Sequence, residues 1–257
     1  MCYFEVTDFY SIWHIIIPHF LNFPFYGVKQ NTFIKFVHAL TLLYPSFNKD
    51  KPKLLLGKLI YLTSDMNTAS NRTEYKNTDL YKKINIRPEE IIVNLKPLSN
   101  TLNYFNPLLA LNVFFIIGVI EGDGSFYIGL RENRKVRFGF SITTHIHEID
   151  LLYKIKWFLN CGIAKSKTNT WCRYEIESSN SLRNILIPLV NTIPLLSSKS
   201  VNFKVFKEAM DLYTKKEHLS DEGLIRLVKL AYANNTKGKR RKYTLEGYLK
   251  KNHLSNN

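Results

Sequence analysis

The sequence is poor in acidic residues and cysteine, and it has no long uninterrupted apolar run. Its 257 residues include 21 Asp and Glu against 36 Lys and Arg, a formal net charge of +15. The three cysteines fit neither a disulfide framework nor a zinc-binding pattern, so we expect a reducing compartment rather than secretion. No apolar stretch reaches the roughly 20 residues that a membrane-spanning helix needs, and we therefore expect no membrane partner.

The composition indicates where the protein is made. Phe, Tyr, Asn, Lys and Ile are abundant, with 17 Phe and 15 Tyr, and all five have A/T-rich codons. We therefore expect an A/T-rich organelle genome, with the mitochondrion as first choice and the chloroplast as the alternative. The apolar region 9–28 is interrupted by His and Pro and lacks a basic leader, so we expect neither a signal peptide nor an import presequence.

The excess of positive charge predicts a polyanionic partner. A charge of +15 favours binding to phosphate-rich polymers and surfaces. Nucleic acid is the first candidate, and an anionic membrane surface is the second. The seven histidines show no spacing typical of metal ligands, so a histidine-based metal centre is not expected.

One short segment combines an apolar run with acidic residues and glycines. Residues 115–126 read Phe-Ile-Ile-Gly-Val-Ile-Glu-Gly-Asp-Gly-Ser-Phe. The apolar part predicts a buried helix that ends near Asp123, where the helix dipole already places partial negative charge. A carboxylate there needs a compensating cation, which could be a basic side chain but which we interpret as a divalent metal ion. Gly118 and Gly122 lie one helical turn apart and would let a second backbone approach closely.

Residues 116–124, with Phe115 before them and Ser125 and Phe126 after them, resemble the signature motif of the LAGLIDADG homing endonucleases. The resemblance implies that Asp123 is the metal-binding catalytic acid and that Glu121 occupies the less essential first acidic position. It also implies Mg²⁺, or another divalent cation, as the cofactor. Lys199 has the spacing of a lysine found near the active site in relatives, and Lys29 is its counterpart in the first half of the chain.

The sequence contains an internal repeat. Residues 2–42 align without a gap to residues 172–212 when residue n is paired with residue n+170, and the identical pairs include two prolines, a lysine and two phenylalanines. Two copies of one structural unit are therefore expected, of which the first lacks its own motif helix and first strands. We accordingly expect the C-terminal part of a first half at 1–67, a linker at 68–106 and a complete half at 107–257.

The complete half is predicted to follow the order α-β-β-α-β-β-α-α, an α+β arrangement. The resemblance implies the same order, as one half of the LAGLIDADG homing-endonuclease fold, a pseudo-symmetric pair of halves of which the first is truncated. After the motif helix, strands are expected at 126–131, 136–142, 163–167 and 170–177, and helices at 149–159, 182–190, 201–213 and 220–233.

The predicted strands alternate apolar and polar residues, which indicates a sheet with two different faces. The apolar face would form the core. The polar face could lie along a DNA groove, with basic groups on phosphates and polar side chains reading base edges. The predicted nucleic-acid-binding residues are Tyr127, Arg131, Arg137, Ser141, Thr143, Lys165, Lys167 and Arg173.

The motif and the charge together favour phosphodiester hydrolysis. This reaction needs an activated water and neutralisation of charge on the leaving oxygen, which metal ions held by carboxylates supply. The leading hypothesis is an intron-encoded, site-specific homing endonuclease that cleaves double-stranded DNA. The alternatives are an RNA maturase that assists splicing of its host intron, and a degenerate remnant that binds nucleic acid without cutting it. Because the sequence encodes one motif acid, cutting both strands would require a longer reading frame or a second copy of the chain.

Overall fold

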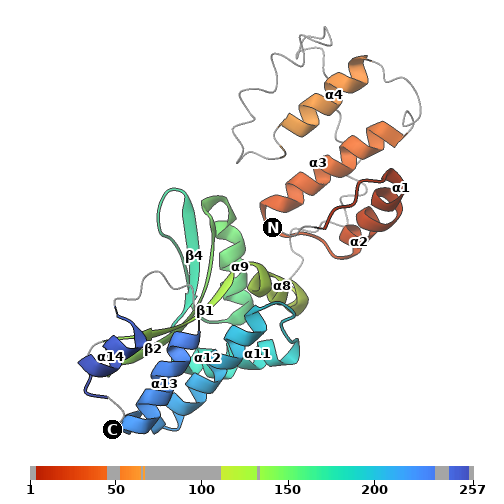
Figure 1. Cartoon of the computed structure of the whole chain (residues 1–257). Coiled ribbons are helices and arrows are strands. Elements are labelled where there is room, and N and C mark those ends of the chain that lie inside the picture. Colours follow the sequence, from red (N-terminus) through yellow and green to blue (C-terminus); the bar gives the residue numbers. More distant parts are fainter. Residues whose placement is uncertain are drawn as a thin grey trace. The chain divides into compact units, whose positions relative to one another are not determined.

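The computed structural model describes most of the chain and divides it into two compact units, Met1–Leu109 and Ala110–Asn257 (Figure 1). The predicted linker at 68–106 lies outside the described residues, so the boundaries 1–67, 68–106 and 107–257 stay predictions. The described residues are 4–44, 53–64, 66, 111–131, 134–234 and 243–254.

A four-stranded antiparallel sheet organises the second unit (Figure 1). β1 and β2 are consecutive, whereas α9 (Ile149–Leu159) separates β2 from β3. The strands lie in the order β1-β2-β4-β3, so β2 and β4 form the centre and β1 is an edge strand that directly follows the motif helix. Their bounds are β1 Gly124–Leu130, β2 Val136–His145, β3 Ile163–Ser166 and β4 Trp171–Ile176.

The strand register confirms the predicted alternation of faces. Phe126 pairs with Phe140 and Ile128 with Phe138, so these side chains point to the same side of the sheet. The motif helix α8 (Val113–Asp123) contacts β1 and β2, α9 contacts β3 and β4, and α12 (Lys199–Thr214) and α13 (Asp221–Ala233) contact β1. The buried residues of the core face are Phe126, Phe138, Phe140, Ile142, Cys172, Tyr174 and Ile176.

An aromatic cluster joins α12 to the sheet. The ring of Phe206 lies 5.4 Å from the ring of Phe126 and 5.7 Å from that of Phe138, measured between centroids. Phe206 is fully buried, and burial of one such side chain stabilises the fold by about 1.5–3 kcal/mol. This packing holds the first turn of α12 near the end of α8.

A π-helical turn precedes a proline in both units. Proline has no N–H, and its ring clashes with the carbonyl four residues earlier in a regular α-helix. The turn therefore widens: the N–H of Ile187 donates to the Leu182 carbonyl before Pro188, and that of Ile17 donates to the Ile12 carbonyl before Pro18. The elements are α10 Ser179–Ser181, η5 Leu182–Leu186 and α11 Ile187–Thr192 in the second unit, and α1 Phe9–Ser11, η1 Ile12–Ile16 and α2 Ile17–Asn22 in the first.

The regular secondary structure of the first unit is all helical within its described residues, and α3 (Val28–Leu43) packs against α4 (Lys53–Ser64). Its buried core consists of Ile17, Phe33, Val37 and Leu40. The repeat seen in the sequence is visible in the backbone, because α1, η1 and α2 recur at n+170 as α10, η5 and α11. None of the helices in the described ranges is long and apolar enough to cross a membrane.

The predicted order is confirmed through the fourth strand, after which α10–η5–α11, α12 and α13 follow, one helix more than the two that the order α-β-β-α-β-β-α-α names. Three short elements were not predicted. These are η4 (Ile146–Glu148), η6 (Glu217–Leu219) and α14 (Leu245–Lys251). α14 is held by a long-range contact, since the hydroxyl of Tyr248 donates to the carbonyl of Arg131 at 3.0 Å.

Candidate functional site

The motif helix ends where it was predicted to end, at Asp123, and β1 begins with the next residue. A methyl group on Gly124 would lie 2.5 Å from the carbonyl oxygen of Ile120 and 2.9 Å from its Cα. A glycine is therefore required for the abrupt change from helix to strand. This change fixes the position of Asp123 at the edge of the sheet.

One face of α8 is buried and the other is open. Ile116, Ile117 and Ile120 face the core. At Gly118 and at Gly122, an added methyl group would have no atom of the described residues within 4 Å, apart from its chain neighbours and the backbone of its own helix. The close approach of a second backbone to these glycines therefore stays a prediction, with room available for it.

A basic side chain compensates the negative end of α8. The ammonium of Lys199 donates to the carbonyl of Ile120 at 3.0 Å and to that of Gly122 at 2.8 Å. Burial lowers the pKa of Lys199 from its usual value, although the charges of Asp123 and Glu121 act in the opposite direction. The compensating cation inferred from the helix dipole is thus a lysine, and the dipole alone does not require a metal ion.

Glu121 is held by the loop that precedes α12. Its carboxylate accepts hydrogen bonds from the backbone N–H groups of Leu196 and Ser197 and from the Ser197 hydroxyl. Burial would raise the pKa of this carboxyl, but the hydrogen bonds from Ser197 and Leu196 and the charge of Lys199 outweigh burial and lower it. Glu121 therefore connects the end of α8 to the start of α12.

Replacement of Glu121 by Gln tests this connection through pH. Because the pKa of Glu121 is lowered in the folded state, its contribution is present above the unfolded value of 4.5 and is lost as pH falls through the folded value. At pH 7 we expect a loss of about 1 kcal/mol in the free energy of unfolding, less than the roughly 1.5–3 kcal/mol typical of charged hydrogen bonds, because the site is solvated. Urea unfolding at pH 7 and pH 3.5 measures the difference.

The difference should be smaller at pH 3.5 than at pH 7, because the contribution of the carboxylate declines once pH falls below the unfolded value. Glu217→Gln is the matched control, because Glu217 is exposed and is likewise an acid in the second unit. Its effect should be the same at both pH values. A loss for Glu121→Gln that does not change with pH would show that the carboxylate charge has no role in the connection.

Asp123 differs from Glu121 in its surroundings. It is exposed, and among the residues that the structure describes no hydrogen bond holds its carboxylate. Carboxylate oxygens are suitable ligands for Mg²⁺, so Asp123 fits the predicted metal-binding role as a single donor. In the described part of the chain no group of three or more His, Cys, Asp or Glu side chains could hold a metal ion. Further metal ligands would have to come from outside the described residues, for example from DNA phosphates or a second motif helix.

The predicted nucleic-acid-binding residues lie mostly on the polar face of the sheet. Thr143 of β2 pairs with Arg173 of β4, which in turn pairs with Lys165 of β3, so the three side chains form a row across the sheet. Arg131 and Lys167 lie just beyond the ends of β1 and β3. The remaining predicted residues on this face are Tyr127, Arg137 and Ser141.

Two residues on this face are constrained by close packing. A methyl group on Gly139 would overlap the ring of Tyr127, so the tyrosine lies flat across its strand partner. Ser141 is buried, which leaves its hydroxyl less accessible than the other predicted contacts.

Acidic residues that the sequence analysis did not select hold the basic ones in place. The carboxylate of Glu175 lies 3.0 Å from the ammonium of Lys167, 3.0 Å from the guanidinium of Arg173 and 3.7 Å from the ammonium of Lys165. Burial would raise the pKa of Glu175, but the hydrogen bonds and charges of Arg173 and Lys167 lower it. The alternation of strand 171–176 placed Glu175 on this face, and the strand register was needed to see the cluster.

A second acid, just after β4, acts in the same way on residues of β1 and β2. Glu177 accepts a hydrogen bond of 3.0 Å from the Tyr127 hydroxyl and pairs with Arg137. The basic face is therefore a set of oriented side chains.

Lys29 lies in the first unit, exposed in the first turn of α3, and its role stays a prediction.

The chain is similar to proteins of one family. Residues 116–210 match the family described as LAGLIDADG endonuclease. The "Probable intron-encoded endonuclease 2" of Neurospora crassa is 28% identical over 231 residues, which are 88% of this chain and 48% of that protein. The "Uncharacterized mitochondrial protein RF1" of Saccharomyces cerevisiae is 26% identical over 233 residues, 80% of this chain and 43% of that protein.

A solved structure shows the same relationship in three dimensions. The I-LtrWI LAGLIDADG homing endonuclease, crystallised bound to target DNA, is 27% identical, with a TM-score of 0.72 over 91% of this chain and 74% of that chain. The chain spans less than half the length of the first curated relatives that it matches. The motif, the order of helices and strands and these similarities agree, and residues 116–210 form a LAGLIDADG endonuclease domain.

Proposed function

We propose that the chain is, or is part of, an intron-encoded homing endonuclease that cleaves double-stranded DNA at a specific site with a divalent metal ion. The observation that carries the proposal is the position of Asp123, an exposed carboxylate without a hydrogen bond in the described residues, at the junction of the motif helix and the sheet. The names of the relatives support an intron origin and, through the yeast protein, a mitochondrial location.

The polar face of the sheet supplies the DNA contacts in this proposal. Arg173, Lys165 and Lys167 would bind phosphate oxygens or base edges, and Tyr127 and Thr143 would add polar contacts. The DNA-bound state of I-LtrWI supports a duplex as the partner. Because Glu175 and Glu177 already orient several of these side chains, less conformational entropy would be lost on binding.

The residues at the end of α8 have separate roles. Asp123 would hold the divalent cation, which when bound supplies charge stabilisation at the scissile phosphate. Lys199 keeps the last turn of α8 intact by binding its carbonyls, and its positive charge lies close to Asp123. Glu121 positions the loop before α12. The open face at Gly118 and Gly122 would receive a second motif helix, from a longer form of the protein or from a second copy.

A supercoiled plasmid that carries the joined exon sequence flanking the reading frame tests the proposed function. Nicking or linearisation that requires Mg²⁺ and is absent with a scrambled site is the expected result. The predicted alternative, an RNA maturase, would appear as tight binding of the host intron RNA with no cleavage of the plasmid. Absence of binding to both nucleic acids would overturn the proposal.

Replacement of Glu175 by Gln is expected to reduce sequence discrimination. The change removes one negative charge and releases Lys165, Lys167 and Arg173 from a common partner. Affinity for random duplex should rise, whereas the ratio of target to random affinity should fall about tenfold, because the oriented contacts are lost. Fluorescence anisotropy at several salt concentrations measures both.

The matched control is Glu208→Gln. Glu208 pairs with Arg226 at 2.7 Å across α12 and α13, so the charge change is the same but lies away from the sheet. If both variants lower the affinity ratio equally, the Glu175 cluster has no part in discrimination.

A further inference from the structure

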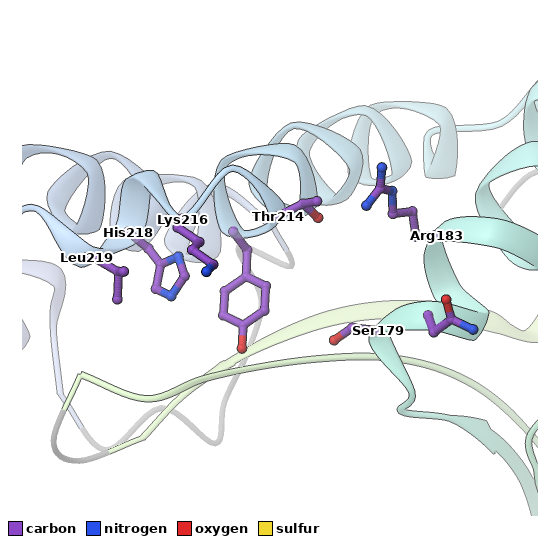
Figure 2. Close-up of a pocket in the computed structure, with 8 residues that line it drawn as sticks. Ser179, Arg183, Thr214, Lys216, His218 and Leu219 are labelled. Carbon is purple, nitrogen blue, oxygen red and sulfur yellow. The ribbon is translucent and has the colours of Figure 1, made fainter.

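The second unit contains a pocket that the proposed endonuclease activity does not use. Its volume is about 520 Å³, within the range of about 300–1,000 Å³ typical of small-ligand sites. It lies between the start of α10, η5, the end of α12 and η6 (Figure 2). The lining residues are Ser179, Asn180, Arg183, Tyr213, Thr214, Lys216, His218 and Leu219.

The pocket has a positive lining. It contains Arg183 and Lys216 and no acidic residue. Within the described ranges, neither cation forms an ion pair with a carboxylate, unlike Arg173 or Lys167 on the sheet. Figure 2 shows Arg183 and Lys216 on opposite sides of Thr214, with Ser179 across from them. Two unpaired cations with hydroxyl groups between them favour an oxyanion with several acceptor atoms.

The same pocket also has a flat apolar part. The rings of Tyr213 and His218 are stacked, with centroids 4.3 Å apart and an interplanar angle of 21°. Leu219 is 70% exposed beside them. Such a surface suits a planar heteroaromatic group, which packs on apolar and aromatic side chains.

The pocket lies on the helix-covered side of the sheet. Tyr213 packs against Phe138, at 5.2 Å between ring centroids, and Phe138 is a core-face residue of β2. Arg137, the preceding residue, points to the opposite face, as strand alternation requires. The pocket is therefore separate from the surface proposed to contact duplex DNA.

We propose that this pocket binds a nucleotide, with the phosphate between Arg183 and Lys216 and the base against Tyr213, His218 and Leu219. A nucleotide combines the oxyanion and the planar ring that the two parts of the lining suit. It could be a free mononucleotide or one nucleotide of a single strand, since both present the same chemistry.

Calorimetric titration of the full chain with adenosine 5′-monophosphate, adenosine, inorganic phosphate and a six-nucleotide single strand tests the proposal. The monophosphate should bind at least about tenfold more tightly than adenosine or phosphate alone, because both parts of the pocket are filled. If the single strand binds more tightly than the monophosphate, the ligand of the pocket is one nucleotide of a strand. Failure of the monophosphate and the strand to bind at millimolar concentration overturns the proposal, as does equal affinity for phosphate alone.

The variant Arg183→Gln with Lys216→Gln should weaken monophosphate binding at least about tenfold. Lys216 has a left-handed backbone with φ of 62°. Gln and Lys tolerate this conformation equally, so the fold should be retained. The control variant, Lys215→Gln with Lys229→Gln, removes the same charge from exposed residues outside the pocket and should leave binding within twofold.

Duplex binding separates this proposal from the proposed endonuclease function. Both double variants should bind the DNA target with equal affinity, because neither alters the polar face of the sheet. A loss of target binding specific to Arg183→Gln with Lys216→Gln would place the pocket within the duplex-binding surface and overturn its independence. Equal nucleotide affinity in the two double variants would equally overturn the assignment.

Discussion

Replacement of Asp123 by Asn is expected to lower the rate of target cleavage by about a thousandfold, with target affinity unchanged within about threefold. Asn keeps the size of the side chain but removes the anionic oxygen that would hold the divalent cation. Asp123 is exposed and makes no hydrogen bond within the described residues, so the free energy of unfolding should change by less than about 0.5 kcal/mol. Plasmid nicking at saturating protein and Mg²⁺ measures the rate.

Asp211→Asn is the control for this prediction. Asp211 is also an exposed aspartate near a helix end, in the last turn of α12, and it should retain full cleavage. If Asp123→Asn nicks at more than about a tenth of the native rate, the carboxylate of Asp123 is not needed for the reaction. The end of α8 would then have a structural role only.

The position of Asp123 was predictable because the signals for it are local. The apolar run, the glycines and the strand alternation that follows all lie within residues 115–126. Gly124 shows why the pattern is so compact, since any side chain there would collide with Ile120. The polar and apolar faces of β1 and β2 were predictable for a similar reason, because the side-chain period of a strand is two.

The partners of the motif residues were not predictable in the same way. Lys199 was selected by spacing, but its contacts with the carbonyls of Ile120 and Gly122 depend on how α12 packs on the sheet. The alternation of its strand puts Glu175 on the polar face, yet its role as a common partner of three cations depends on the register of β3 and β4. Sequence patterns report periodicity along the chain, whereas these contacts join segments far apart in it.

The π-helical turns were predictable in part. Pro18 and Pro188 were recognised as a repeated pair, and a proline inside a helix disturbs the hydrogen bonds before it. The form of the disturbance, a widened turn ending in an i to i−5 bond to Ile12 or Leu182, emerged from the structure. α14 was missed because the contact of Tyr248 with Arg131 is long-range.

Replacement of Phe206 by Ala is expected to lower the free energy of unfolding of the second unit by about 3–5 kcal/mol. The side chain is fully buried and its ring contacts those of Phe126 and Phe138, so its loss leaves a cavity between α12 and the sheet. Because Lys199 begins the same helix, its contact with the end of α8 should loosen as well, and cleavage should fall with stability.

The repeat supplies the matched control for this change. Phe36 is the residue aligned with Phe206 at n+170, and it is only half-buried against the core of the first unit. Phe36→Ala should therefore cost less than half as much and should act on the other unit. Hydrogen exchange of backbone amides, which follows each unit separately, measures both effects. Equal losses from the two variants, or a loss in the second unit below about 1 kcal/mol, would mean that the cluster around Phe206 does not hold α12 on the sheet.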